Sequence, residues 1–291
     1  MKQMTCDIAI VGGGLAGMTL AAFLGAGGLD VICIDQFDPK AQIKADERTT
    51  AVSFGSRKIL EQAGVWESCA PEACPIRDIR ILDGQGSRVL LNFLSEEADG
   101  KDFGWIVENA VLRRACLDKL AALKTVTFMA PAKAKSFDLG ADGASVTLDD
   151  GSVINAALIV GADGRKSPLR TALDIETRGR DYGQRALVSI IGHENPHDGV
   201  AIEHFYPAGP FAVLPMTDAP DGTHRSSIVL TEHGPEDKSM MHFSKEAFMA
   251  ALEARLPESY GVISMRMGPQ AFPLNLVHSE SYTAPQSCAD R

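Results

Sequence analysis

The sequence predicts a mixed α/β fold, in which a helix-covered parallel sheet carries an inserted antiparallel sheet. The first 35 residues have the pattern strand, glycine turn, helix, strand, which is a βαβ unit. After about residue 180, short alternating strands punctuated by Pro and Gly dominate, as in an antiparallel sheet. The 291 residues suffice for two linked cores, and 45% apolar with 23% charged residues excludes a disordered chain.

The βαβ unit can be followed residue by residue. Residues 6–11 form a short apolar run suited to a buried parallel strand. An Ala- and Leu-rich helix pattern follows over residues 18–25, and a second apolar strand over 31–34 ends at Asp35.

A GxGxxG motif connects the first strand to the helix. Gly12 permits the tight turn, Gly14 lets backbone amides approach a pyrophosphate, and Gly17 lets the helix pack closely on the strand. The helix N-terminus adds free N–H groups and a positive dipole. Asp35, at the end of the next strand, is placed to accept the ribose hydroxyls of an adenosine. These features predict a Rossmann-like dinucleotide site, with a glycine-rich turn that binds no ligand as the alternative.

The middle of the chain alternates helices and strands. We expect a helix over 56–63, two strands over 76–82 and 88–93 joined by a turn at 83–86, and a long amphipathic helix over 109–123. Further short strands follow, over 126–129, 144–148, 152–155 and 157–160.

The last of these strands runs into the segment GADGRKSPLR, residues 161–170. Asp163 and Gly164 lie between the strand and a short helix pattern. An Asp-Gly turn followed by a helix cap would have the same pattern, so the motif by itself is ambiguous.

The second half of the chain has the alternating pattern of an antiparallel sheet. Strands are expected over 185–191, 200–206, 211–216 and 226–231, with one helix over 244–256. On these strands His204, Tyr206 and Pro215 are candidates for substrate contact, although packing or surface roles explain them equally well.

Charge and cysteine usage narrow the function. The 38 acidic residues outnumber the 28 basic ones, for a formal net charge of −10, so no nucleic-acid partner is expected. No apolar run reaches the roughly 18 residues of a membrane span. The cysteines are scattered without a CxxC motif and are expected to be reduced thiols in a cytoplasmic protein, mostly acting as small hydrophobes. They are Cys6, Cys33, Cys69, Cys74, Cys116 and Cys288.

These motifs together resemble the FAD-dependent aromatic hydroxylases related to para-hydroxybenzoate hydroxylase. Besides the glycine motif and Asp35, the resemblance rests on DERTTA at 46–51 and GADGRKSPLR at 161–170. NAVLRR at 109–114, GPFAVLP at 209–215 and FPL at 272–274 resemble the ubiquinone-biosynthesis branch (UbiH/UbiF/COQ6-like). The resemblance covers nearly the whole chain.

The resemblance implies individual roles at a FAD site. Asp35 would bind the adenosine ribose, and Arg48 would lie near the ribityl chain or the phosphates. Arg113 would face FAD, with a solvated helix arginine as the alternative, and Asp163 would contact FAD and the nicotinamide donor. The implied cofactor residues are Gly12, Gly14, Leu15, Ala16, Gly17, Asp35, Arg48, Arg113, Asp163 and Gly164. The sequence identifies no catalytic base.

The implied activity is hydroxylation of an aromatic ring, in this branch a polyprenylated phenol, with NAD(P)H as reductant and O2 as oxygen source. The implied location is cytoplasmic or peripheral to the inner membrane, with association with a ubiquinone-biosynthesis complex. Three alternatives stay open: a flavin-dependent reductase or halogenase of the same fold, an NAD-dependent dehydrogenase without flavin, and a non-catalytic FAD-binding fragment.

The resemblance also implies a domain division. A discontinuous FAD-binding domain is expected from 1–75 and 101–178, and a substrate-binding β-sheet domain from 76–100 and 179–275. Residues 276–291 would begin the return to the FAD domain. Relatives carry a third motif, Gly-Asp-Ala-Ala-His, which is absent from this sequence, so a truncated flavoprotein with little or no monooxygenase activity of its own is expected.

One further motif suggests different chemistry. Residues 193–197, His-Glu-Asn-Pro-His, spell the HExxH pattern of zinc peptidases, which needs both histidines on one helical face. Pro196 stands where helical hydrogen bonding is required, and a strand pattern precedes it. We therefore expect a loop between strands and no metal site.

Overall fold

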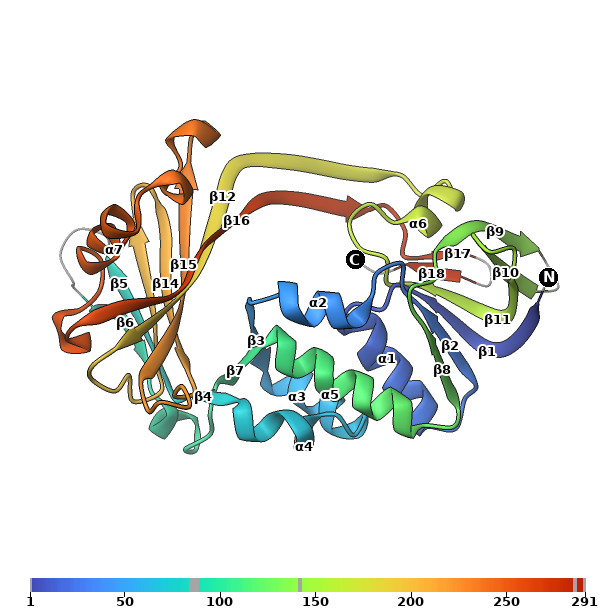
Figure 1. Cartoon of the computed structure of the whole chain (residues 1–291), viewed down its shortest axis with the longest axis horizontal. Coiled ribbons are helices and arrows are strands. Elements are labelled where there is room, and N and C mark those ends of the chain that lie inside the picture. The colour runs from blue at the N-terminus through green and yellow to red at the C-terminus, as the bar shows by residue number, and fades with distance from the viewer. Residues whose placement is uncertain (1, 84–88, 141–142, 285–286, 290–291) are drawn as a thin grey trace.

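The computed structural model describes residues 2–83, 89–140, 143–284 and 287–289. It shows an elongated molecule with one sheet at each end and a layer of helices between them (Figure 1). The predicted mixed α/β fold is confirmed.

The first sheet is built on the predicted βαβ unit. Strand β1 (Gln3–Val11) lies between β11 (Val153–Gly161) and β2 (Val31–Ile34), parallel to both, and β2 pairs in turn with β8 (Val126–Met129). Helix α1 (Leu15–Ala26) connects β1 to β2 and packs on the sheet. The carboxyl ends of β1, β2 and β11 therefore meet at one edge.

One expectation for this sheet was wrong. The two strands predicted over 152–155 and 157–160 are the single strand β11, which pairs with β10 (Gly143–Leu148) through its first part and with β1 along its whole length. Strand β9 (Ala134–Gly140) was not predicted. The chain returns to the sheet through β17 (Thr283–Ala284) and β18 (Ser287–Ala289), which pairs parallel to β11.

The helical layer encloses the main core of this end. Buried Ile10, Met18 and Val31 pack with Leu112 and Trp66 in one cluster. A small sheet in the order β3-β7-β4 lies beside the helices. The elements of this layer are α2 (Pro39–Ala45), β3 (Thr49–Ser53), α3 (Phe54–Gln62), α4 (Trp66–Cys69), η1 (Ala70–Glu72), β4 (Cys74–Ile76), β7 (Gly104–Glu108) and α5 (Asn109–Ala122).

The second sheet has the strand order β16-β12-β15-β14-β13-β5-β6 and is antiparallel except where β13 runs parallel to β5. The strand predicted over 76–82 is broken at Arg77, because β4 ends at Ile76 in the small sheet and β5 begins at Asp78 in this one. The predicted turn at 83–86 lies, beyond Asp83, outside the described residues. The strands are β5 (Asp78–Asp83), β6 (Val89–Phe93), β12 (Thr177–His193), β13 (Val200–Tyr206), β14 (Gly209–Met216), β15 (His224–His233) and β16 (Ile263–Ser279).

The two faces of the second sheet have different neighbours. One face packs under α7 (Lys245–Glu253), where Phe211, Ile228 and Phe248 form a core. The opposite face is turned toward the helical layer, and Val188 and Met216 pack there against Ile106. The remaining short helices are η2 (Ser95–Ala98), α6 (Pro168–Ala172), η3 (Glu236–Lys238), η4 (Met240–His242) and η5 (Glu258–Tyr260).

Long strands β12 and β16 join the two ends of the molecule as a two-stranded arm (Figure 1). The pairing extends from Thr177 and Ser279 to His193 and Ile263. The predicted boundary between residues 178 and 179 thus falls inside β12.

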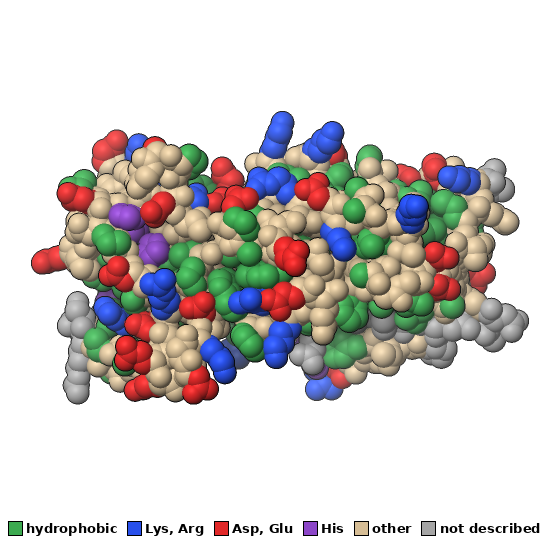
Figure 2. All heavy atoms as spheres, turned by 90° about the horizontal axis from the view of Figure 1, so that it is seen from below, with side chains coloured by type: hydrophobic (Ala, Val, Ile, Leu, Met, Phe, Trp, Pro, Cys, Tyr) green, Lys and Arg blue, Asp and Glu red, His purple; other side chains and the backbone are tan. Residues whose placement is uncertain are grey.

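The surface carries charges of both signs. Acidic and basic side chains are interspersed over the face in Figure 2, without a large basic patch. Among the described residues, no helix has both the length and the apolarity needed to cross a membrane.

Candidate functional site

The glycine loop after β1 uses its glycines for two different purposes. A Cβ on Gly12, whose φ is +112°, would lie 2.1 Å from the Ala162 carbonyl oxygen, and one on Gly17 would lie 1.9 Å from the Gly12 oxygen. These two glycines allow the close approach of loop, helix and β11. Gly14 has a φ of −69° and nothing within 4 Å of its Cβ position. Its missing side chain leaves space for a ligand.

The N-terminus of α1 is open to an anion. Gly14 is the N-cap and supplies no side-chain hydrogen bond, and the first turn contains no acidic residue. In the part of the chain that the structure describes, the amides of Leu15, Ala16 and Gly17 have no acceptor. The side chains of Leu15 and Ala16 line an apolar cavity, so these two residues can serve an anion only through their backbone N–H groups.

Asp35 holds the glycine loop in place. The carboxylate is nearly buried at the end of β2 and accepts the Gly13 N–H at 2.7 Å and the Phe37 N–H at 2.8 Å. Each oxygen keeps a lone pair for another donor, such as a ribose hydroxyl. This second role, in loop geometry, was not predicted from the sequence.

A cavity of about 330 Å³ opens where the carboxyl ends of β1, β2 and β11 meet. Asp163 lines this cavity together with the glycine loop, and its Oδ2 accepts a hydrogen bond from the Leu169 N–H at 3.1 Å. In a doubly wound sheet, ligands bind at this edge of the strands. Five predicted residues line the cavity, namely Gly12, Gly14, Asp35, Asp163 and Gly164.

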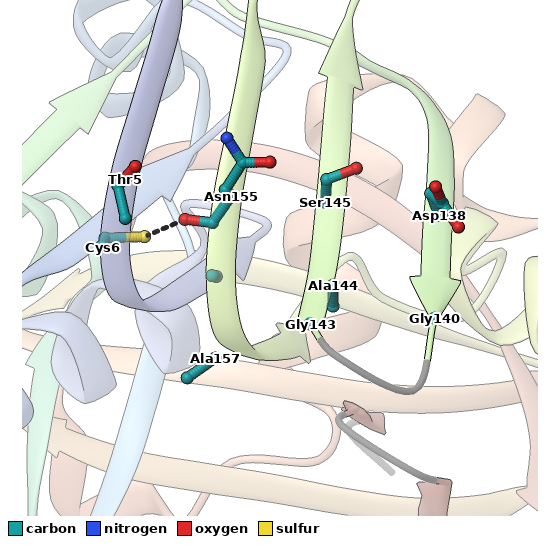
Figure 3. Close-up of a pocket in the computed structure, with 10 residues that line it drawn as sticks. Thr5, Cys6, Asp138, Gly140, Gly143, Ala144, Ser145, Asn155 and Ala157 are labelled. Carbon is teal, nitrogen blue, oxygen red and sulfur yellow. Dashed lines mark hydrogen bonds between the residues drawn. The ribbon is translucent and has the colours of Figure 1, made fainter.

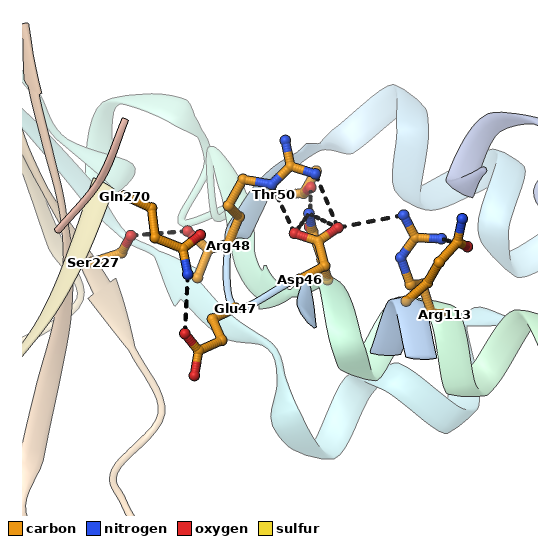
Figure 4. A network of polar contacts seen from close by, with 10 residues as sticks. Asp46, Glu47, Arg48, Thr50, Arg113, Ser227 and Gln270 are labelled. Carbon is orange, nitrogen blue, oxygen red and sulfur yellow. Dashed lines mark hydrogen bonds and ion pairs between the residues drawn. The ribbon is translucent and has the colours of Figure 1, made fainter. Parts of the chain in front are cut away.

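The two predicted arginines lie elsewhere, around the carboxylate of Asp46 (Figure 4). Arg48 binds it with two hydrogen bonds, Nε at 2.7 Å and Nη2 at 3.0 Å. Arg113 Nη2 reaches it at 3.4 Å, and Asn109 Nδ2 at 3.1 Å. Thr50 completes the network by donating to Asn109 Oδ1 at 2.6 Å.

Asp46 is the charge that holds this cluster together. Burial opposes its ionisation, but the hydrogen bonds from Arg48 and Asn109 and the charges of Arg48 and Arg113 outweigh burial and hold its pKa below the usual value. Asp46 was not among the predicted site residues, although DERTTA includes it. The sequence signal for Asn109 is its i,i+4 spacing from Arg113 on α5.

Gln42 connects the two halves of the site. It lines the 330 Å³ cavity and also a second cavity of about 220 Å³, beside Arg48 and Arg113. Its Oε1 accepts Arg113 Nη1 at 2.9 Å. Among the described residues, the Nε of Arg113 is buried without a hydrogen-bond partner.

The second cavity ends against the antiparallel sheet. Phe272 and Gln270 of β16 line it, and the Arg48 guanidinium lies 4.9 Å from the centre of the Phe272 ring. Gln270 donates to Glu47 at 3.0 Å, and Thr49 donates to Ser227 at 3.0 Å. The site therefore runs from the glycine loop past the arginines to the second sheet.

Larger cavities lack this combination of groups. One of about 570 Å³ lies over the far end of the first sheet, where the side chains of Thr5, Asn155, Ser145 and Asp138 follow one another across four strands (Figure 3). Another, of about 660 Å³, is lined mainly by apolar residues of α1, β3, α3 and α5. Neither is lined by a basic side chain.

The HExxH segment forms no helix, as predicted. His193 ends β12, where its Nδ1 faces the Asn195 oxygen at 2.7 Å and its Nε2 faces Ser226 Oγ at 3.0 Å. His197 Nε2 contacts the Met216 oxygen at 2.8 Å, and its Nδ1 accepts a hydrogen bond from the Gly199 N–H. The described residues include no cluster of ligands suited to a metal ion.

Residues 5–271 match the family described as FAD binding domain. Among curated proteins, the chain is 42% identical over 257 residues to the ubiquinone hydroxylase UbiL of Rhodospirillum rubrum, covering 88% of this chain and 58% of that protein. It is 28% identical to the 3-demethoxyubiquinol 3-hydroxylase of Escherichia coli, covering 98% of this chain and 72% of that enzyme. The chain thus spans little more than half the length of the first relative.

Solved structures share the fold. PqsL of Pseudomonas aeruginosa in complex with 2-aminobenzoylacetate superposes with a TM-score of 0.79 at 19% identity, covering 98% of this chain and 78% of PqsL. The p-nitrophenol 4-monooxygenase PnpA of Pseudomonas putida superposes with a TM-score of 0.76 at 14% identity, covering 99% and 72%.

Proposed function

Because the chain belongs to the FAD binding domain family, we propose that it binds FAD and forms the cofactor and substrate-sheet part of a monooxygenase that hydroxylates an aromatic ring. The observation that carries the proposal is the open space at Gly14, in front of unpaired amides at the start of α1. The adjoining cavity continues toward two arginines, so the site suits an elongated, doubly phosphorylated ligand.

FAD would lie along this path. Its pyrophosphate would accept from the N–H groups of Leu15 and Ala16, and its adenosine ribose would donate to Asp35. Arg113, which lines the second cavity, would donate to the ribityl or phosphate oxygens. When bound, FAD supplies the redox and oxygen-transfer chemistry.

The substrate would occupy the space between the helical layer and the second sheet. Similarity to ubiquinone hydroxylases supports a polyprenylated phenol as substrate, with NAD(P)H as reductant and O2 as the oxygen source.

We also propose two domains. The FAD-binding domain comprises residues 1–75 and 101–178, and the substrate-binding domain comprises residues 76–100 and 179–275, because β5 and β6 join the second sheet. Association with the membrane surface or with other ubiquinone-pathway proteins belongs to the same proposal.

Isotope labelling tests this function. The chain is loaded with FAD and incubated with 2-prenylphenol, NADH or NADPH, and ¹⁸O2, and the phenol is analysed by mass spectrometry. We expect a product heavier by one ¹⁸O atom, detectable even at low turnover. NAD(P)H oxidation without labelled product would indicate a reductase instead, and failure to bind FAD would refute the proposal at its base.

A further inference from the structure

The face of the second sheet that is turned toward the helical layer carries a half-buried acidic side chain, Glu203, beside apolar ones. Successive residues of β13 point to opposite faces. Ile202 packs in the core under α7, whereas Ala201 packs with the residues that face the helical layer. Glu203 therefore shares the face of Ala201.

The predicted candidates on this strand lie on the other face. Tyr206 packs against the core under α7, with the Arg255 guanidinium 5.9 Å from its ring centre. The rings of His204 and Tyr206 are tilted by 38° with their centres 4.1 Å apart, and His204 Nε2 contacts the backbone oxygen of Asp83 at 2.8 Å. These contacts explain both residues by packing, and they leave Glu203 as the ionisable group of β13 on the substrate side.

Within the described ranges, Glu203 forms no hydrogen bond and no ion pair. Its neighbours in register are Ala212 of β14 and Ile81 of β5, and Ile81 is in register with the exposed Leu91 of β6. Half-buried in this setting, the carboxylate loses water and gains nothing in return, and burial raises its pKa. Such a group is typical of a binding or catalytic site.

Glu203 also lies at a suitable distance from the cofactor half of the site. Thr49, next to Arg48, contacts the sheet at Ser227 of β15, and β13 is two strands further along. Ser227 is in register with Leu214, and Glu203 with Ala212, so two strand spacings and an offset of two residues along the strand separate Ser227 from Glu203. Together these amount to roughly 12 Å, which exceeds the width of one aromatic ring.

We propose that Glu203 binds the ring hydroxyl of a phenolic substrate and accepts its proton. This inference rests on the proposed function. The ionised carboxylate accepts the hydroxyl hydrogen bond, the O–H bond breaks, and the proton passes to Glu203 while the electron pair stays on the phenol oxygen. The ring becomes more electron-rich and hence a better acceptor of the oxygen atom.

Binding measurements test the contact without turnover. Dissociation constants of 2-prenylphenol and its methyl ether are measured by calorimetry on the FAD-loaded chain, for the wild type, Glu203→Leu and the matched control Asp83→Asn. Asp83 is an exposed acid on the same face, in register with Phe205. We expect the wild type and the control to bind the phenol about tenfold or more tightly than the ether, and Glu203→Leu to bind both alike. Equal preference in Glu203→Leu and the wild type, or no preference in the wild type, would overturn the inference.

Kinetics test the proton transfer. Glu203→Gln keeps an oxygen acceptor but cannot take up the proton, so it should retain the preference for phenol while hydroxylation slows by about 10²- to 10⁴-fold. The wild-type rate should fall as the pH drops through the pKa of Glu203, and the variant should lose this acidic limb. A wild type that forms labelled product, together with a Glu203→Gln variant of equal rate, would refute the role of Glu203 and leave the proposed function standing.

Discussion

At the scale of single residues, Asp46 shows how one buried carboxylate positions two arginines that come from different parts of the chain. Arg48 follows it closely in sequence, whereas Arg113 lies on α5. Replacing such a carboxylate leaves cations without their counter-charge in a partly buried setting.

Asp46→Asn should lower the free energy of unfolding by about 2–4 kcal/mol at pH 7. The pKa of Asp46 is lower in the folded chain than in the unfolded one, so its stabilising effect is present above the unfolded value, 3.8, and is lost as the pH falls through the folded value. Urea denaturation at pH 7 and near pH 3 should show the gap between variant and wild type closing. Asp118→Asn, an exposed acid on α5, is the control and should change stability by less than about 0.5 kcal/mol. A gap of the same size at both pH values would contradict this account.

Residue types with local signals were predictable, and residues defined by distant contacts were not. The loop around Gly12 and Gly14 was predictable because its strand, turn and helix are consecutive in the sequence. Thr49 and Ser227 meet across 178 residues of sequence, and no local pattern announces that contact. Asp35 both holds the glycine loop and faces the cavity, and the first of these roles could not be predicted without the structure.

At the scale of elements, alternation and helical periodicity predicted those strands and helices that bury one clear face. Strand β13 coincides with the predicted range 200–206. Strand β3 was missed because it is short and buries only one of its five residues, and β16 because Gly and Pro interrupt it. Strand β11 was divided in two, although β1 pairs with it along its whole length. Its other edge changes partner from β10 to β18, which the sequence does not record.

Helix α7 should prove essential to the second sheet. Phe248 of this helix packs into the core of the sheet and is 1% exposed. Phe248→Ala should therefore cost about 3–5 kcal/mol of unfolding free energy. Phe243→Ala, at a side chain that is 46% exposed before the helix, should cost much less. Chemical denaturation of both variants checks the expectation, which fails if the two substitutions have equal effects.

At the scale of the whole molecule, buried thiols are distributed through one half of the fold and can report on its integrity. Five described cysteines are free and buried, and burial is the largest cause that raises their pKa values, to about 11 or 12. The prediction that the cysteines act as small hydrophobes is confirmed for these five. They are Cys6, Cys33, Cys69, Cys74 and Cys116.

In a Cys288→Ser background, native protein at pH 8 should therefore react with a disulfide reagent such as DTNB far more slowly than denatured protein, which should release five equivalents at once. Addition of FAD should slow the native reaction further, because a bound ligand lowers the population of opened states. Rapid reaction of the native chain would show that the core is not closed as described.

The central claim is that the space at Gly14 receives the pyrophosphate of FAD, and a fluorescence titration of FAD tests it most directly. The wild type should bind one FAD per chain. Gly14→Val, whose Cβ would meet no protein atom within 4 Å, should lower the unfolding free energy by no more than about 1 kcal/mol but bind FAD at least tenfold more weakly. Gly55→Val, also an open position at the start of a helix, is the matched control and should bind FAD like the wild type. A folded Gly14→Val variant with wild-type affinity for FAD would contradict the claim.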